Sequence, residues 1–198
     1  MFHRVTIRVA DLPAAERFYD TVLPTLGIER QAGDFSLARA DGEHPVTRGL
    51  HMGFRAPSRA EVDEFWRAGT AAGYQDDGAP GPRPQYTEDY YGSFLLDPDG
   101  NSAEAVHHGA MRGDGAIDHL WIRVADVAAS KRFYEDVAPH AGFRLAADDT
   151  PRYARFAGEG GSFSLIAGRP SENVQMTFRG EVTGVRLDPD GNRVELVS

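Results

Sequence analysis

The feature that most constrains the fold is an internal duplication. Residues 2–11 read F-H-R-V-T-I-R-V-A-D, and residues 117–126 read I-D-H-L-W-I-R-V-A-D. Each copy is followed by a segment that ends in Phe-Tyr and an acid, and each half closes on L-D-P-D-G-N-x-x-E, ending at Glu104 or Glu195. Such repeats narrow the choice of architecture before any other signal does. Because these copies bracket whole halves, we expect two homologous domains rather than a solenoid.

The expected boundaries are 1–108 for the first domain, 109–115 for a linker and 116–198 for a second, shorter domain. A chain of 198 residues is long enough for two small domains. In the first half, a strand near 50–55 leads to a helix near 59–73, which Ser58 and Glu61 open as a capping box. In the second half, the matching strand at 173–178 turns directly into 182–187. The second domain is therefore predicted to lack one helix and a neighbouring strand.

Alternation of apolar and polar residues predicts half-buried strands at 3–9 and 118–124. Val5, Ile7 and Val9 share one face of the first strand, opposite Arg4, Thr6 and Arg8. Asp11 and Asp126 stand at the N-cap positions of helices expected at 13–24 and 127–139. Further strands are expected at 34–40, 152–157 and 162–167. A hairpin of 90–97 with 102–107 follows a loop or irregular edge strand at 76–89.

Composition excludes several classes of protein. The chain is 41% hydrophobic, so it can build cores, and no stretch is apolar for long enough to span a membrane. It has no cysteine, which excludes disulfides and thiolate metal sites. A formal net charge of −9 argues against nucleic acid and anionic membranes as partners. No signal peptide is apparent, and we expect a cytoplasmic protein that acts on a small molecule.

The patterns D-H-x-x-x-R-V-A-D, H-x-x-F-R-A-P and Y-Y-x-x-F-x-x-D-P-D-G-N-x-x-E resemble the vicinal oxygen chelate superfamily. That superfamily includes glyoxalase I, bleomycin-resistance proteins and extradiol dioxygenases, and the resemblance covers nearly the whole chain. It implies an α+β fold of tandem βαβββ modules, whose curved mixed sheets enclose cavities. It also implies metal ligands on first and last strands, and a substrate that chelates the metal through two adjacent oxygens. The metal would act as a Lewis acid or activate oxygen.

Mapped onto the first half, the resemblance places ligands at His51 and Glu104. The first-strand ligand would fall at Arg4, which stands four residues before Arg8 as His119 stands before Arg123. A guanidinium only donates hydrogen bonds and cannot bind a metal. We therefore expect an ion pair of Arg4 with Glu104. His51 and Glu104 are the second choice as metal ligands. His3 lies one residue away, on the opposite face of the strand unless a bulge intervenes.

Mapped onto the second half, the same positions are His119, Gln175 and Glu195, the first choice for a metal site. An amide oxygen is a poor but workable ligand for hard or borderline metals. The expected cofactor is one divalent metal (Zn, Ni, Fe or Mn), or none. Since neither half has two histidines and one carboxylate, the sequence argues against ring-cleaving dioxygenase chemistry.

The sequence therefore predicts an enzyme with a degenerate metal site and lyase, isomerase or cyclase-type chemistry on a substrate with adjacent oxygens. Glu104 or Glu195 would be the catalytic base, and the residues expected to bind substrate are Arg4, His51, Trp121 and Tyr86. The alternative is a metal-free binding or resistance protein that sequesters an aromatic or cationic metabolite. A third interpretation is a pseudo-enzyme whose truncated half forms a homodimer. His107 and His108 are expected to be an exposed strand end.

Overall fold

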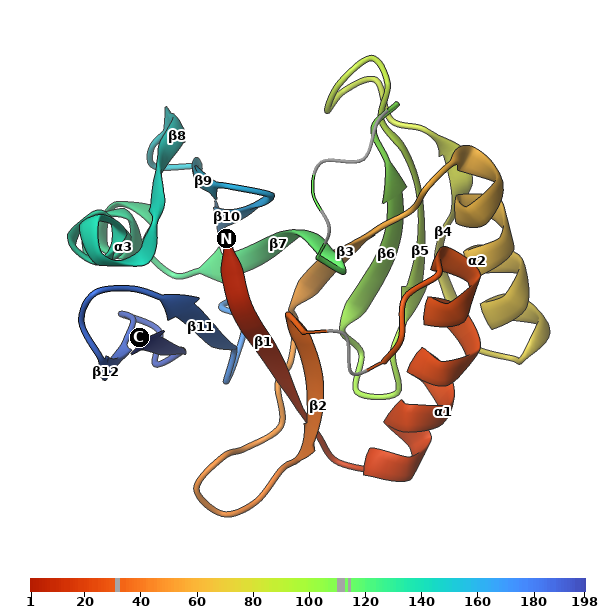
Figure 1. The fold of residues 1–198 in the computed structure, drawn as a ribbon, viewed down its shortest axis with the longest axis horizontal. Helices are drawn as coiled ribbons and strands as arrows, with labels where there is room; N and C mark the ends of the chain where they lie inside the picture. Colours follow the sequence, from red (N-terminus) through yellow and green to blue (C-terminus); the bar gives the residue numbers. More distant parts are fainter. Residues whose placement is uncertain (31–32, 110–112, 114) are drawn as a thin grey trace.

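A computed structural model of the chain describes residues 1–30, 33–109, 113 and 115–198, so most of the predicted linker lies outside the described residues. The described chain forms two mixed sheets with helices on their outer faces (Figure 1). The helices are α1 (Leu12–Val22), the 3₁₀ turn η1 (Leu23–Leu26), α2 (Arg59–Ala71) and α3 (Val127–Ala141). This is the α+β fold that the family resemblance implies. No helix of the described residues has the length and apolar character to cross a membrane.

Each sheet combines strands from both sequence repeats. The larger sheet has the spatial order β4 (Gln75–Pro82), β5 (Tyr91–Leu96), β6 (Ser102–His107), β3 (His51–Arg55), β7 (Ile117–Val124), β10 (Gly161–Ala167), β9 (Tyr153–Gly158) and β8 (Phe143–Asp149). The smaller sheet has the order β12 (Gly184–Leu187), β13 (Arg193–Val197), β11 (Gln175–Arg179), β1 (Phe2–Val9) and β2 (Phe35–Arg39). The first strand of each repeat therefore pairs with the other repeat, since β7 joins β3 and β1 joins β11.

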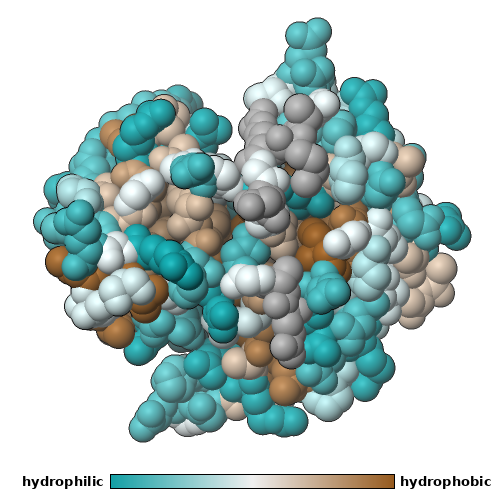
Figure 2. Space-filling model, viewed as in Figure 1, coloured by the Kyte–Doolittle hydropathy of each residue, from teal (hydrophilic) through white to brown (hydrophobic). Residues whose placement is uncertain are grey.

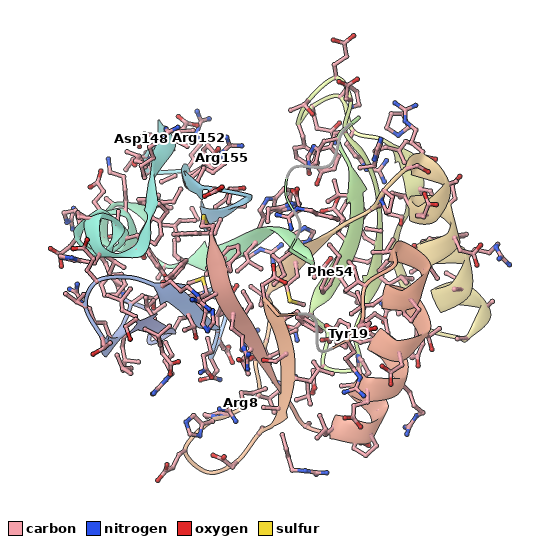
Figure 3. All side chains as sticks on the ribbon, in the orientation of Figure 1. Arg8, Tyr19, Phe54, Asp148, Arg152 and Arg155 are labelled. Atoms are coloured by element: carbon pink, nitrogen blue, oxygen red, sulfur yellow. The ribbon has the colours of Figure 1, made fainter. Side chains whose placement is uncertain are left out.

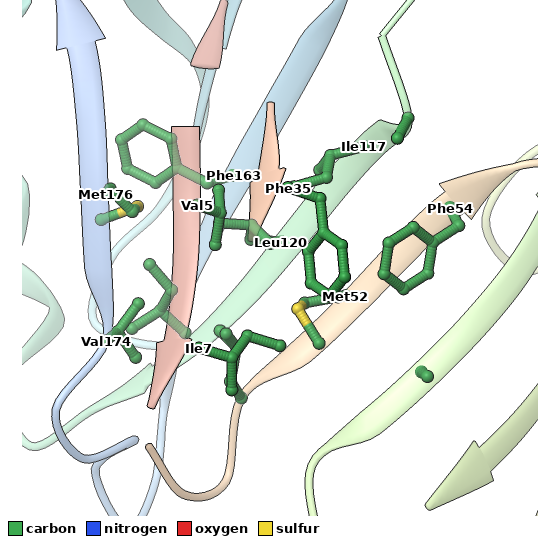
Figure 4. Packing of buried hydrophobic residues seen from close by; sticks show 14 of the residues in the cluster. Val5, Ile7, Phe35, Met52, Phe54, Ile117, Leu120, Phe163, Val174 and Met176 are labelled. Atoms are coloured by element: carbon green, nitrogen blue, oxygen red, sulfur yellow. The ribbon is translucent and has the colours of Figure 1, made fainter. Parts of the chain in front are cut away.

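The predicted faces of the first strands explain why the two sheets pack together. Val5, Ile7 and Val9 are fully buried on β1. Their counterparts Leu120, Ile122 and Val124 on β7 are fully buried in the same hydrophobic cluster. Figure 4 shows Val5 and Ile7 close to side chains of both sheets. Because the apolar faces of both first strands are buried in one core, the opposite face of each strand carries the polar side chains.

The repeated D-P-D-G-N segment is a structural anchor. Asp97 accepts hydrogen bonds from the backbone of Asp99 and Asn101 and from the hydroxyl of Tyr19 on α1. The amide oxygen of Asn101 accepts from the backbone nitrogen of Leu50, the residue immediately before β3. In the second repeat, Asp188 makes the same contacts with Asp190, Asn192 and Tyr134. The motif therefore ties the hairpin to the helix that begins each repeat, which accounts for its presence in both halves.

Most predicted elements are present with shifted ends. The deletion in the second repeat is confirmed, because β11 is followed by β12 with no helix between them. The stretch 76–89 contains the irregular edge strand β4, whose register with β5 shifts twice. β8 was not predicted, since its sequence F-R-L-A-A-D-D ends in acids rather than β-branched residues.

The surface is mostly hydrophilic in the view of Figure 2, with hydrophobic residues in small patches.

Candidate metal centre

Three buried side chains from neighbouring strands of the larger sheet converge on one point. His51 of β3, Glu104 of β6 and His119 of β7 each offer a ligand atom, and these atoms lie within 4.8 Å of one another. His51 Nε2 is 2.9 Å and His119 Nε2 3.2 Å from the same carboxylate oxygen, Oε2 of Glu104. The two histidines come from different sequence repeats, which is possible only because β7 pairs with β3.

A glycine makes room for this cluster. Gly53 pairs with Glu104 on one side and with His119 on the other. A Cβ atom added at Gly53 would lie 2.4 Å from Cε1 of His119, so any larger residue would displace the imidazole. Gly92 on β5 plays the same part for Glu104, since its added Cβ would be 2.4 Å from Oε1. The backbone is therefore shaped to admit the two side chains.

Neighbouring polar groups orient each member of the cluster. Nδ1 of His119 lies 3.0 Å from a carboxylate oxygen of Asp118, and Nδ1 of His51 lies 3.1 Å from the hydroxyl of Ser102. The hydroxyl of Tyr90 donates to Oε1 of Glu104 at 2.7 Å. These contacts leave Nε2 of both histidines and Oε2 of Glu104 directed at the common point. A histidine whose other nitrogen meets a carboxylate is the usual arrangement around bound metals.

The charges within the cluster compensate one another. Burial would lower the pKa of His119, but the carboxylates of Asp118 and Glu104 outweigh it and raise that pKa to about 9. Burial likewise opposes ionisation of Glu104, yet the two histidines lower its pKa to about 2. For His51, burial dominates and lowers the pKa. At neutral pH the metal-free cluster therefore holds an ionised Glu104, a protonated His119 and a neutral His51.

The residues fit a divalent metal. Nε2 of His119 is buried and makes no hydrogen bond, although Oε2 of Glu104 lies 3.2 Å away. A buried polar nitrogen without a partner is costly, and a metal would satisfy it. Two imidazoles and one carboxylate with open positions are the donor set of mononuclear non-haem iron sites and also suit zinc.

Two adjoining pockets lead to the cluster. One, of about 410 Å³, includes His51, and the other, of about 470 Å³, includes His119. Trp121, Tyr86 and Ile166 line both pockets. Trp121 is stacked on His51 with ring centroids 4.6 Å apart, and Tyr86 meets Trp121 edge-on at 5.3 Å. His51, Trp121 and Tyr86, three of the four predicted substrate-binding residues, thus lie together beside the cluster.

The predicted grouping of the other site residues does not hold. Gln175 and Glu195 lie on β11 and β13 of the smaller sheet, whereas His119 lies on β7 of the larger one. Arg4 pairs with Thr177 in the smaller sheet and makes no ion pair with Glu104. The register of β1 does shift between Phe2 and Arg4, yet His3 contacts Arg179 and is far from the cluster's strands. The error was to assume that each repeat completes its own site.

Sequence reasoning missed three residues around the cluster, namely Asp118, Tyr90 and His108. His108 was expected to be exposed, but its side chain is 7% exposed and lies 3.1 Å from Asp118. The Asp-His pair at 118–119 was the available signal for Asp118. Nothing local distinguished Tyr90 from Tyr91, whose hydroxyl donates to Asp63 at the surface.

Comparisons with known proteins agree on the fold. No family model matches the sequence, and no curated protein matches it. Among solved structures, glyoxalase I from Zea mays is similar over 100% of this chain and 92% of its own, with 17% identity and a TM-score of 0.69. A candidate dioxygenase from Bacillus subtilis covers 98% of this chain and 84% of its own, with 11% identity and a TM-score of 0.61. A glyoxalase/bleomycin resistance protein from Albidiferax ferrireducens is 32% identical over 54% of this chain and 98% of its own, with a TM-score of 0.47.

Proposed function

We propose that this chain, which has the fold of glyoxalase I over its full length, is a mononuclear metal enzyme of the vicinal oxygen chelate type for a small substrate with two adjacent oxygen atoms. His51, His119 and Glu104 would hold one divalent metal. The observation that carries this proposal is the convergence of three buried donor atoms within 4.8 Å of one another, next to a pocket. A divalent metal there would polarise substrate oxygens as a Lewis acid or, if it is iron, activate dioxygen.

The surrounding residues have distinct tasks in this proposal. Asp118 and Ser102 fix the ring orientations of the two histidines. Tyr90 keeps its proton, because burial and then Glu104 raise its pKa far above neutrality, and so it holds Oε1 of Glu104 by a hydrogen bond. The indole of Trp121 offers a flat wall beside His51 for a planar substrate. In this arrangement Glu104 acts as a metal ligand rather than as the predicted base.

Dioxygen-dependent chemistry is the first candidate. The sequence argued against it because neither repeat contains two histidines and one carboxylate, but the larger sheet assembles that set from both repeats. The set leaves coordination positions open for a chelating substrate and a further ligand. Glu195, the other predicted base, lies in the smaller sheet and has no part in this centre.

Lyase or isomerase chemistry is the second candidate, favoured by the full-length likeness to glyoxalase I. Oxygen uptake separates the two candidates. Protein loaded with Fe(II) and offered catechol in an oxygen electrode consumes oxygen if the first candidate is correct. A metal-loaded protein that converts a substrate with adjacent oxygens without oxygen consumption supports the second.

Metal stoichiometry tests the proposal as a whole. Wild-type protein, dialysed against Zn(II) and then against buffer, should retain one zinc per chain by mass spectrometry of the elements. His51→Ala should retain none. His44→Ala is the matched control, because His44 lies outside the cluster and pairs with Asp41 near the surface, and it should behave as the wild type. Equal zinc in all three proteins would refute the centre.

A further inference from the structure

The cavity contains an arginine that the proposed metal chemistry does not use. Arg155 stands on β9, opposite Ser164 of β10, which in turn pairs with Trp121 of β7. Side chains in register across neighbouring strands share one face of the sheet. Arg155 accordingly lines the same pocket as His119 and Trp121. Arg155 is exposed to solvent on this face, so its guanidinium can reach a molecule bound in that pocket.

Nearby acids do not neutralise Arg155. Asp148 on the adjacent strand β8 binds Lys131 of α3 at 2.5 Å, and Asp149 binds Arg152 at 2.9 Å. The residue opposite Arg155 on β8 is Ala147. Figure 3 labels Arg155 with Asp148 and Arg152 at this end of the sheet. Within the described part of the chain, no carboxylate forms an ion pair with Arg155, although acids outnumber bases by 30 to 21 in the sequence.

The remaining cavity wall offers no internal partner either. The carboxylate that lines this pocket, Asp118, is already in contact with His108 and His119. Ser162 and Ser164 on β10, the strand between β9 and β7, add two hydroxyl groups to the same pocket wall. A free guanidinium beside hydroxyls and an indole is suited to a planar molecule with a carboxylate, since the guanidinium fork matches a carboxylate in two hydrogen bonds.

The position of Arg155 sets the length of that molecule. Arg155 is two strands away from His119 and is offset from it by two residues along the strand direction. At ordinary strand spacings, this separates their Cα atoms by roughly 12 Å. A carboxylate directly beside the chelating oxygens would remain at the metal and could not meet the guanidinium. We propose, on the basis of the proposed function, that the substrate carries a carboxylate remote from its two chelating oxygens and that Arg155 binds it. Such a substrate is opposite in charge to the cationic guest considered for a binding protein.

Three catechols test the inference by calorimetric titration of the zinc-loaded protein. Catechol has the chelating oxygens alone, 2,3-dihydroxybenzoate has a carboxylate beside them, and 3,4-dihydroxybenzoate has it across the ring. Wild-type protein should bind 3,4-dihydroxybenzoate about tenfold or more tightly than the other two, as a charge-assisted hydrogen bond to a carboxylate allows. Arg155→Gln should abolish this preference, and Arg155→Lys should retain part of it.

Arg152→Gln is the matched control, because this neighbouring arginine pairs with Asp149 on the surface and is 80% exposed in its side chain. It should preserve the preference. A zinc-loaded wild type without preference for 3,4-dihydroxybenzoate, or a preference that survives in Arg155→Gln, would overturn the inference and leave the metal centre intact. A chain that takes up no zinc would instead refute the proposed function.

Discussion

The two sheets share one set of paired strand positions. In the larger sheet these positions carry a candidate metal cluster, and in the smaller sheet they carry an ion pair of arginine with glutamate. In the larger sheet, Gly53 pairs with Glu104 and His119, and in the smaller sheet Thr177 pairs with Glu195 and Arg4. The other matched positions follow from the same registers: His51 with Gln175, Ser102 with Arg193, and Trp121 with Thr6. Only the glutamate is common to both sites.

The retained glutamate shows that one residue does not make a site. Glu104 is fully buried between two histidines and Tyr90. Glu195 has a side chain that is 21% exposed and is bound by Arg193 at 2.5 Å and Thr177 at 3.2 Å. In the smaller sheet, arginine supplies permanently the positive charge that a metal would bring. Thr177 stands at the position that matches Gly53, and its hydroxyl donates to Glu195.

The largest effect expected from this comparison is the loss of metal in Glu104→Gln. The change keeps the shape of the side chain and removes the anionic ligand, so the affinity for zinc should fall by more than about a hundredfold, above the loss typical of outer-shell changes. Glu195→Gln, its matched control, should leave the affinity unchanged. Zinc titration of both proteins checks this, and equal losses would show that the two sites are not separate.

A second large effect is expected from Gly53→Ala. The new Cβ would press on the imidazole of His119 at 2.4 Å, which should lower metal affinity about a hundredfold. Overpacking of this kind should also reduce the free energy of unfolding by about 1–3 kcal/mol. Denaturant unfolding and zinc titration measure the two quantities. The reverse change at the matched position, Thr177→Gly, removes a hydrogen bond to Glu195 and should create no metal affinity.

The comparison also shows how much of the core and of the candidate site could be predicted from the sequence. Alternation along each strand is enough to place Val5, Ile7 and Leu120 in the core, and His51, Glu104 and His119 on polar faces. The partner of each first strand could not be predicted. Pairing of β7 with β3 rather than with β11 is a long-range choice made by packing of the whole core, and no local residue pattern encodes it. The three candidate ligands were thus identified individually and grouped wrongly.

Asp118→Asn should have a smaller effect, because it leaves all three ligands in place. The amide weakens the hold on Nδ1 of His119, and outer-shell changes of this type reduce metal affinity by about 10–100-fold. The matched position in the smaller sheet is His3, where His3→Asn should change nothing. An unaltered zinc affinity in Asp118→Asn would mean that Asp118 does not orient His119.

Both the affinity for zinc and the stability of the metal-free protein should depend on pH through His119. Because the pKa of His119 is raised from 6.5 to about 9, a metal must displace its proton at neutral pH. The affinity for zinc should rise about tenfold per pH unit between pH 7 and 9 and then level off. The same raised pKa contributes stability that is complete below about pH 6.5 and is lost as pH rises through about 9. Thermal unfolding of metal-free protein should show that decline, and His119→Gln should not.

The smallest effect is expected where ligands are added to the smaller sheet. A double variant, Arg4→His with Gln175→His, places two imidazoles beside Glu195, at the positions that match His119 and His51 of the larger sheet. It should still bind no second zinc, because Arg193 remains ion-paired with Glu195 and Thr177 occupies the place of Gly53. Addition of Thr177→Gly and Arg193→Ser should then open the site. Two zinc ions per chain in the double variant alone would show that the donors suffice, and that the space around them does not distinguish the two sheets.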